Sequence, residues 1–165
     1  MQVKSFIVDS PIGQLSVFYC ENKVLEIRFA LDKEQPDSWK TEPVNGKPDK
    51  FATQVKAQLL DYFGNPEHSF SIDIQVKGTD FQKAVWQVIA SIKAGDTLTY
   101  SDVAQKLGSS PRAVGNACRA NPTPIIVPCH RVVAKSGLGG FAGKTTGFNI
   151  DMKSWLLEHE QVVLT

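Results

Sequence analysis

The stretch NPTPIIVPCHRVV, residues 121–133, carries a cysteine directly before a histidine in a backbone stiffened by three prolines. Proline fixes its own φ angle and pushes the preceding residue into an extended conformation, so few backbone conformations remain open here. A thiolate is a strong nucleophile, and a nearby imidazole can take the thiol proton. Cys129 and His130 are therefore a candidate nucleophile and base, placed by a rigid backbone.

The geometry of this pair needs further groups. In an extended strand, Cys129 and His130 would point to opposite faces, so a turn or a bridging water must connect them. A carboxylate could orient the histidine, as in nucleophile–base–orienter triads, and the candidates are Glu158 and Glu160 in SWLLEHE. A buried structural cysteine is common and would explain Cys129 without any chemistry. The segment by itself leaves both interpretations open.

The preceding segment, TYSDVAQKLGSSPRAVGNACRANP, predicts two short helices joined by a glycine-containing turn. Ser101 is the expected N-cap of the first, over residues 102–107. Pro111 opens the second at its first position and the helix ends near Ala120. This arrangement is typical of a helix-turn-helix.

The second of these helices has a basic face. Arg112, Asn116 and Arg119 lie four and three residues apart and so share one face, while the opposite face carries the small Ala113 and Ala117. Such a helix can lie close to a DNA backbone. An ordinary helical hairpin with a solvated basic face is the competing interpretation.

The first 76 residues predict a small α+β unit. Short Val-, Ile- and Phe-rich segments, KSFIVDS, LSVFYC and VLEIRFA, predict an antiparallel meander, and the polar segment 30–50 predicts a loop. FATQVKAQLLDYFG, residues 51–64, has helical spacing, and HSFSIDIQV, residues 68–76, alternates like a strand.

Further elements are predicted on either side of the candidate site in the sequence. Residues 79–95 predict a helix capped by Thr79 or Asp80 and stopped by Gly95. The glycine-rich segment 137–147 predicts a loop that lets the backbone approach a planar ligand. DMKSWLLEHE predicts a closing helix. The side chains expected to be buried there are Trp155, Leu156 and Leu157.

Composition excludes several classes of protein. The chain is 42% hydrophobic and 21% charged, as in globular proteins, and no run approaches the roughly 18 apolar residues of a membrane span. The N-terminus lacks the pattern of a signal peptide, so we expect a cytoplasmic protein. Three cysteines without a C-x-x-C disfavour a disulfide framework, and together with three histidines they make a poor zinc set, so no metal is expected.

Charge is unevenly distributed along the chain. Residues 1–75 carry eight basic and eleven acidic side chains, a net −3, whereas residues 76–165 carry ten basic and six acidic side chains, a net +4. The C-terminal part is therefore the better candidate for binding a polyanion.

The 22-residue segment RAVGNACRANPTPIIVPCHRVV resembles the core signature of the O6-alkylguanine-DNA alkyltransferases, the methylated-DNA–protein-cysteine methyltransferases. The segment TYSDVAQKLGSSPRAVG and the terminal WLLEHE also fit, so the resemblance covers about residues 79–160. It implies a two-domain α+β and α/β fold. Residues 1–76 would form an RNase H-like antiparallel sheet with a helix, and residues 77–165 a winged helix-turn-helix-like DNA-binding domain.

The resemblance implies a single-turnover suicide reaction in DNA repair. A monomer would bind double-stranded DNA and flip an O6-alkylguanine, with O4-alkylthymine as a second candidate, into a pocket. Cys129 would take the alkyl group irreversibly, without metal or organic cofactor. His130 would act as the base through water, polarised by Glu160, while Asn121 braces the loop and Tyr100 protonates the leaving guanine at N3.

The resemblance also implies a set of substrate contacts. Arg112 would enter the base stack, and the main-chain carbonyls of Cys129 and Val132 would accept from the guanine amino group. Two loop positions depart from the family, because Phe141 stands where many members have tyrosine and Ala142 where serine can occur. The KTTGFNI segment also looks longer than in compact relatives. The remaining residues assigned to DNA or substrate are Asn116, Arg119 and Gly143.

Three other functions fit parts of the sequence. Alkyltransferase-like proteins bind lesions without transfer, but they carry another residue, often tryptophan, where Cys129 stands. A DNA-binding regulator with Cys118 or Cys129 as a redox switch is compatible with the helix-turn-helix alone. A Cys–His hydrolase would need an oxyanion hole and turnover, and it would leave the DNA-binding helix unexplained.

Overall fold

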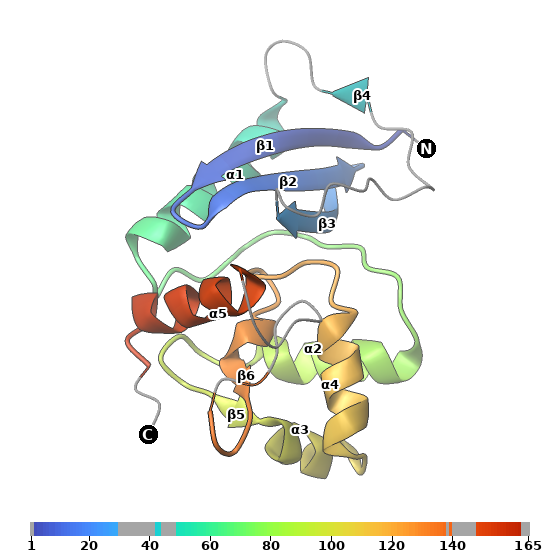
Figure 1. The fold of residues 1–165 in the computed structure, drawn as a ribbon. Helices are drawn as coiled ribbons and strands as arrows, with labels where there is room; N and C mark the ends of the chain where they lie inside the picture. The colour runs from blue at the N-terminus through green and yellow to red at the C-terminus, as the bar shows by residue number, and fades with distance from the viewer. Residues whose placement is uncertain (1, 30–41, 44–48, 138, 140–147, 163–165) are drawn as a thin grey trace. The chain divides into compact units, whose positions relative to one another are not determined.

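The computed structural model describes residues 2–29, 42–43, 49–137, 139 and 148–162 (Figure 1). Its contacts divide the chain into two compact units, Met1–Val76 and Lys77–Thr165. The first unit holds an antiparallel sheet with a helix, and the second is mostly helical. The predicted fold class is therefore confirmed.

The sheet of the first unit has the order β3-β2-β1-β4. Strands β1 (Lys4–Ser10), β2 (Gly13–Cys20) and β3 (Lys23–Phe29) form the predicted antiparallel meander, and the two-residue β4 (Glu42–Pro43) pairs in parallel with β1. The register aligns Val8 with Leu15 and Leu15 with Phe29 across the three strands. All three side chains are buried, so this row forms part of the core.

Helix α1 (Lys50–Gly64) lies against β1 and begins one residue before its predicted start at residue 51. Asp49 caps it, because its carboxylate accepts a hydrogen bond from the Ala52 amide at 2.8 Å. Val55, Leu59 and Tyr62 are fully buried at the helical spacing expected of a core-facing stripe.

The strand predicted over residues 68–76 is wrong. Only one bridge forms there, between Val24 and Ile74, supported by hydrogen bonds from the Val24 amide to Asp73 and from the Gln75 amide to Val24. Exposed and half-buried side chains do alternate along residues 68–76. At Ser71, however, a side chain of helix α1 takes the place of a neighbouring strand. The Gln58 amide binds both backbone groups of Ser71, at 2.8 and 3.1 Å, and so satisfies them without a ladder.

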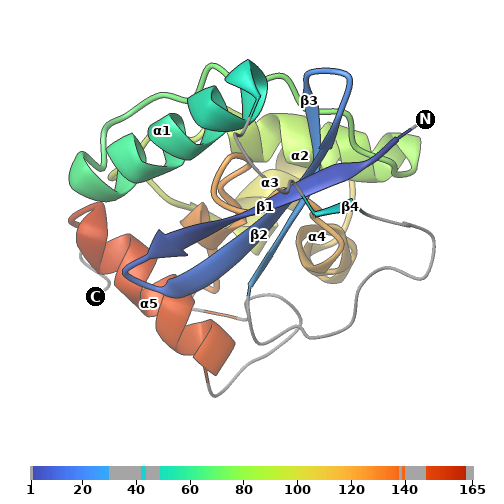
Figure 2. The same cartoon turned by 90° about the horizontal axis from the view of Figure 1, so that it is seen from above.

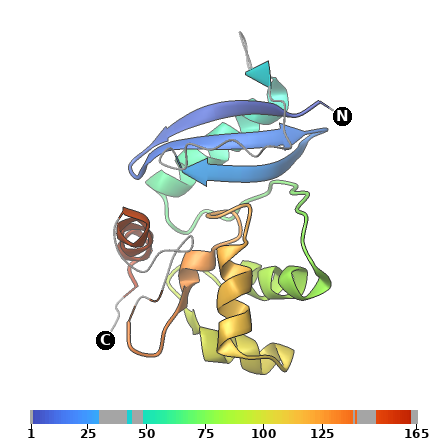
Figure 3. The same ribbon diagram turned by 45° about the vertical axis from the view of Figure 1, so that its right-hand side comes forward.

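The second unit contains a three-helix group and a short parallel pair of strands (Figures 2 and 3). The helices α2, α3 and α4 pack against one another, and the 3₁₀ helix η1 lies against both α2 and α5. The elements are α2 (Asp80–Ala90), β5 (Leu98–Thr99), α3 (Tyr100–Leu107), α4 (Pro111–Arg119), η1 (Cys129–Arg131), β6 (Val132–Val133) and α5 (Phe148–His159).

Two predicted helix limits need correction. Helix α2 begins after Thr79, which forms a capping box with Gln82, but it ends at Ala90 rather than near Gly95. Helix α3 is capped by Thr99 rather than by Ser101. Asp102 decides this start, because its carboxylate accepts a 2.9 Å hydrogen bond from the Thr99 amide while its own amide donates to the Thr99 hydroxyl.

The predicted helix-turn-helix is present. Gly108 closes α3 in the left-handed region at φ 62°, and Ser110 caps α4 with Pro111 at the first position. Buried Val114 and Ala117 face the core, whereas Ala113 is only half-buried.

A buried tryptophan ties α4 to α2. The indole N–H of Trp86 donates to the carbonyl of Ala117 at 2.8 Å, across 31 positions of sequence. Gly78 makes room for this indole, because a Cβ at that position would lie 2.6 Å from its ring. The orientation of α4 is thus set by packing against α2 as well as by its own caps.

The closing helix α5 begins earlier than its predicted start at residue 151. Leu156 and Leu157 are buried as predicted. Trp155 is only half-buried, contrary to prediction, because its ring stacks on His159 with centroids 4.9 Å apart. Lys153 is fully buried instead.

Candidate functional site

The proline-rich segment positions the candidate nucleophile by a turn. Residues 125–127 do not form an extended segment, because Ile125 has φ 76° and the Val127 amide donates to the Thr123 carbonyl at 2.9 Å. A positive φ is rare for a β-branched residue, so this conformation stores backbone strain that the surrounding packing must hold. Ile125 and Val127 are both buried, which supplies that packing.

Asn121 fastens this turn from the end of α4. Its side-chain N–H donates to the Val127 carbonyl at 2.9 Å, and its carbonyl oxygen accepts from the Thr123 amide at 3.1 Å. A hydrogen bond from the Asn121 side chain also acts on the Cys129 thiol. One amide therefore connects the helix, the turn and the cysteine.

Cys129 and His130 occupy the 3₁₀ helix η1, which begins after Pro128. Consecutive residues of a 3₁₀ helix diverge by about 120° rather than pointing to opposite faces as in a strand. Both side chains are buried, with exposed fractions of 7% and 0%. The turn that the sequence required between thiol and imidazole is therefore supplied by η1.

Of the two candidate carboxylates, the structure brings Glu160 to the histidine. Glu160 Oε2 lies 2.8 Å from His130 Nε2, whereas Glu158 is exposed. Arg131 completes the network, because its Nε donates to Glu160 Oε1 and its Nη2 to Oε2, both at 2.8 Å. This fork-like pairing fixes the carboxylate plane behind the imidazole.

Arg131 was missed in the sequence. The feature that could have indicated a role for Arg131 is a charged residue inside an otherwise apolar segment, directly after the Cys-His pair. A further bond from Arg131 Nη1 to the Ile92 carbonyl anchors it to the chain after α2.

The environment favours the neutral forms of the Cys129 thiol and the His130 imidazole. Burial is the largest influence on Cys129 and raises the pKa of its thiol, although Asn121 and Lys153 oppose it. Burial also lowers the pKa of His130, against the opposing effect of Glu160. If Nε2–H donates to Glu160, the lone pair is on Nδ1, which is buried and has no hydrogen-bond partner among the described residues.

Tyr100 lies at the start of α3 and is half-buried. Gly139 approaches it closely, since a Cβ at that position would lie 2.8 Å from Tyr100 Cε2 and 3.0 Å from its hydroxyl. The φ of Gly139 is +73°, so both the backbone conformation and the space favour glycine there.

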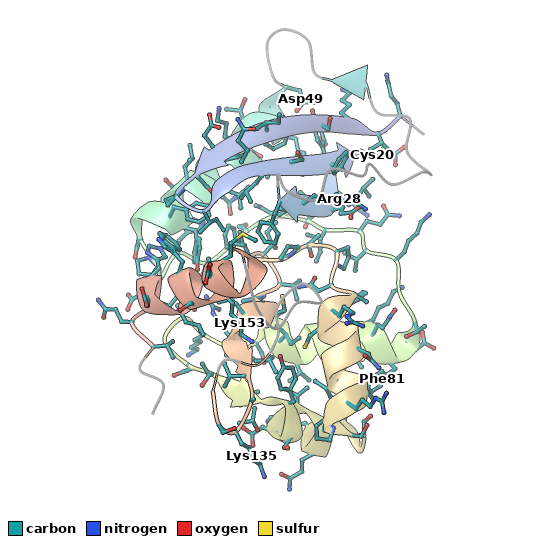
Figure 4. All side chains as sticks on the ribbon, viewed as in Figure 1. Cys20, Arg28, Asp49, Phe81, Lys135 and Lys153 are labelled. Atoms are coloured by element: carbon teal, nitrogen blue, oxygen red, sulfur yellow. The ribbon has the colours of Figure 1, made fainter. Side chains whose placement is uncertain are left out.

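Lys153, from α5, is a second residue that the sequence did not single out. Its Nζ donates to the Val132 carbonyl at 2.8 Å and lies 5.8 Å from the centroid of the Tyr100 ring. Figure 4 shows the labelled side chain leaving α5 toward the interior of the second unit. Its neighbours in the sequence gave no signal, because a lysine on a helix is usually exposed.

The outer face of α4 carries the predicted basic set. Arg112, Asn116 and Arg119 are all exposed. No atom lies within 4 Å of where a Cβ on Gly115 would be, so the same helix presents a low, open surface beside them. The predicted loop residues Phe141, Ala142 and Gly143 lie outside the described residues.

The described ranges hold neither a metal-binding cluster nor a membrane-spanning helix. No group of three or more His, Cys, Asp or Glu side chains there could hold a metal ion. No helix in that part of the chain is both long and apolar enough to cross a membrane. Cys20, Cys118 and Cys129 are all free thiols.

Comparison with known proteins identifies the family. Residues 80–162 match the family described as "6-O-methylguanine DNA methyltransferase, DNA binding domain". The chain belongs to this family, which confirms the resemblance seen in the sequence.

Similar proteins match along nearly the whole chain. The constitutive methylated-DNA--protein-cysteine methyltransferase of Bacillus subtilis is 36% identical, with 93% of each chain covered. A probable enzyme of the same name from Acanthamoeba polyphaga mimivirus is 38% identical, with 96% of this chain and 97% of that protein covered.

Solved structures agree with these matches. The Mycobacterium tuberculosis O6-methylguanine methyltransferase superposes with a TM-score of 0.80 at 35% identity, covering 97% of this chain and 93% of that one. A structure of the Mycobacterium tuberculosis OGT in complex with DNA gives a TM-score of 0.79 at 34% identity, covering 98% and 93%.

Proposed function

We propose that this chain is a DNA-repair methyltransferase that transfers the alkyl group of O6-alkylguanine in duplex DNA to Cys129. The observation that carries the proposal is the buried chain of Cys129, His130 and Glu160, in a member of the 6-O-methylguanine DNA methyltransferase family. O4-alkylthymine is a second candidate substrate, because its alkyl group is also attached to an exocyclic oxygen of the base.

The reaction forms one bond and breaks one. The Cys129 sulfur attacks the alkyl carbon in line with the O6 oxygen, a carbon–sulfur bond forms, and the carbon–oxygen bond electrons return to guanine. The thiol proton goes to His130, and guanine N3 takes a proton from Tyr100. The thioether is stable, so each molecule reacts once.

His130 suits the role of base because of how Glu160 holds it. Because Nε2 is engaged by Glu160 at 2.8 Å, the other ring nitrogen, Nδ1, is the one that can accept a proton. The proton would reach it through a bridging water, as the resemblance implies. Arg131 pairs with the carboxylate and fixes its orientation. Proton transfer from Cys129 to this imidazole then needs no movement of the backbone.

Helix α4 suits docking to DNA. Its exposed Arg112, Asn116 and Arg119 give positive charge and hydrogen-bond donors on one face. Arg112 enters the stack and fills the space left by the flipped base. The Val132 carbonyl is a further candidate contact for the flipped base, and the resemblance assigns Phe141, Ala142 and Gly143 to the substrate as well.

The two units act as separate domains, 1–76 and 77–165, in a monomer. The larger positive charge of the second domain fits its assignment to DNA. A cytoplasmic location suits the chemistry, because the reactive thiol must stay reduced and all three cysteines are free.

The test is intact-protein mass spectrometry after incubation with a duplex containing one O6-methylguanine. A single gain of one CH₂, mapped to Cys129 by peptide digestion, is the expected result. Tight binding of the lesion without any gain in mass would instead support a protein that binds lesions without transfer.

A further inference from the structure

Lys153 is the buried charged side chain that the proposed reaction does not yet use. It lies in the second turn of α5 with an exposed fraction of 0%, between the buried Met152 and the later Leu156. Burying an ammonium group costs free energy, and an apolar side chain would fill the position without that cost. A specific role in the site would account for lysine there.

The contacts of Lys153 converge on the turn that carries Cys129. The amide of Val132 donates to the Cys129 carbonyl and so closes η1. The carbonyl of the same Val132 accepts from Lys153 Nζ at 2.8 Å. The lysine therefore holds the residue that completes the turn, and its amine also lies 5.8 Å from the centroid of the Tyr100 ring.

The charge of Lys153 acts on the thiol. It lowers the pKa of Cys129 against the larger effect of burial. Burial lowers the pKa of Lys153 itself to about 8, while Cys129 and Cys118 oppose that change. At His130, Lys153 is the smallest of the causes that affect the pKa, and it acts in the same direction as burial.

The ionisable groups around this amine come from three elements. The titratable groups coupled to or facing it are Cys118 of α4, Tyr100 of α3, and Cys129 and His130 of η1. The neighbouring charges of Arg131 and Glu160 pair with each other.

We propose that Lys153 is a positioning residue of the transfer site, which holds the Cys129 turn through the Val132 carbonyl and, as an ammonium, stabilises the thiolate. The inference rests on the proposed function, because transfer consumes that thiolate. Both effects nevertheless act on Cys129 before any DNA is bound. They can therefore be measured without the repair reaction.

Two variants separate the two effects. Lys153→Met keeps the length of the side chain but removes both donor and charge, and Lys153→Gln keeps a donor without charge. Lys83→Met, at an exposed lysine of α2, is the matched control. Rates of Cys129 modification by iodoacetamide, mapped by peptide digestion, and of methyl transfer are measured from about pH 6 to about pH 10.

Near neutral pH, both Lys153 variants should react roughly three- to tenfold more slowly than the wild type, since one pKa unit changes the thiolate fraction about tenfold. This deficit should shrink above pH 8, where the wild-type lysine loses its own proton. Lys153→Met should keep an additional, pH-independent deficit that Lys153→Gln lacks. Lys83→Met should behave as the wild type.

Rates equal to the wild type, or an equal loss at every pH in both variants, would overturn the electrostatic role. Thermal unfolding followed by circular dichroism shows whether the Met variant folds, and the Gln variant carries the test if it does not. If iodoacetamide gives the expected profile but even the wild type transfers no methyl group, the proposed function fails while the assignment of Lys153 stands.

Discussion

The two units each bury a reduced cysteine, but they surround it with different groups. Cys20 is 4% exposed and belongs to an apolar cluster of the first unit, whereas Cys129 is 7% exposed and has Asn121, His130 and Lys153 near it. Burial therefore does not separate a structural thiol from a reactive one. The polar groups buried with the thiol do.

The two units also differ in how deeply they bury charged side chains. In the first unit, the ion pairs of Lys4 with Asp49 and of Arg28 with Glu26 keep between 18% and 45% of each side chain exposed to solvent. The buried polar and charged side chains found among the described residues are Thr123, His130, Arg131, Lys153 and Glu160, all of the second unit. Burying charge is costly, so its concentration around Cys129 points to chemistry rather than to stability.

The largest expected effect comes from exchanging the two cysteines in turn. Cys129→Ser should abolish methyl transfer, because a serine hydroxyl remains protonated, and should leave DNA binding nearly unchanged. Cys20→Ser should keep transfer and cost about 1–2 kcal/mol of folding stability, because it places a hydroxyl in an apolar cluster. Transfer assays with lesion duplex and urea unfolding measure the two. Transfer retained in Cys129→Ser would move the acceptor to Cys118 or Cys20.

The next effect compares a buried carboxylate with a surface one. Glu160→Gln should lower the free energy of unfolding by about 2–4 kcal/mol, because it leaves Arg131 buried opposite a neutral group. Asp49→Asn should cost about 0.5 kcal/mol or less, since asparagine also caps helices and the pair with Lys4 is exposed. Urea unfolding of both variants measures the difference. Similar losses would remove the distinction between the units.

An Arg112 variant tests whether base flipping and alkyl transfer depend on different residues of the second unit. Arg112→Ala should slow repair of duplex DNA by roughly ten- to a hundredfold, an effect of about 1.4–2.8 kcal/mol, because the flipped base is no longer replaced in the stack. Reaction with free O6-benzylguanine should be nearly unchanged, since no base has to be flipped. Lys83→Ala, on the exposed side of α2, serves as control. Equal losses on both substrates would place Arg112 in the pocket instead.

The smallest expected effect is a difference in acid sensitivity. The pKa of His130 is lowered, chiefly by burial, so below its ordinary 6.5 the unfolded chain takes up a proton that the folded site refuses. Burial acts to raise the pKa of Asp49, but hydrogen bonds from Ala52, Tyr19 and Lys4 lower it overall. The ionised Asp49 carboxylate therefore stabilises the fold above pH 3.8. This stabilisation is lost only as the pH falls through the pKa of Asp49 in the folded protein, which lies below 3.8.

Hydrogen exchange corrected for its intrinsic pH dependence should therefore show the second unit losing protection first. Peptides around His130 should lose protection progressively as the pH falls below 6.5. Peptides of β1 to β3 should keep their protection until lower pH. Simultaneous loss in both units would show that other groups control the acid transition.

Much of the secondary structure could be predicted because local patterns decide it. The apolar spacing of α1 and the Pro111 start of α4 depend on residues within one or two turns. Residues 68–76 could not be predicted correctly, because the Gln58 side chain, 13 positions away, binds the backbone of Ser71 and only a single bridge forms, to Val24. Alternation reports an extended chain, not the presence of a neighbouring strand.

In the site, too, the residues of a contiguous motif could be predicted and those placed by tertiary packing could not. The motif around Cys129 and His130 is contiguous, so the pair and a terminal glutamate could be proposed directly from the sequence. The choice of Glu160 over Glu158, and the role of Lys153, depend on how α5 is rotated against η1. That rotation is set by core packing across more than 20 residues, which no local pattern encodes.

The hydrogen bond from Trp86 to Ala117 gives the molecule a spectroscopic reporter of its own. An indole N–H resonance depends strongly on the length of its hydrogen bond, and this one ends on the backbone of α4. With three tryptophans in the chain, isotopic labelling yields only three indole signals, and a Trp86→Phe variant assigns the relevant one. Titration with duplex DNA should move that signal as α4 adjusts, so docking can be followed by resonance position without attaching any dye.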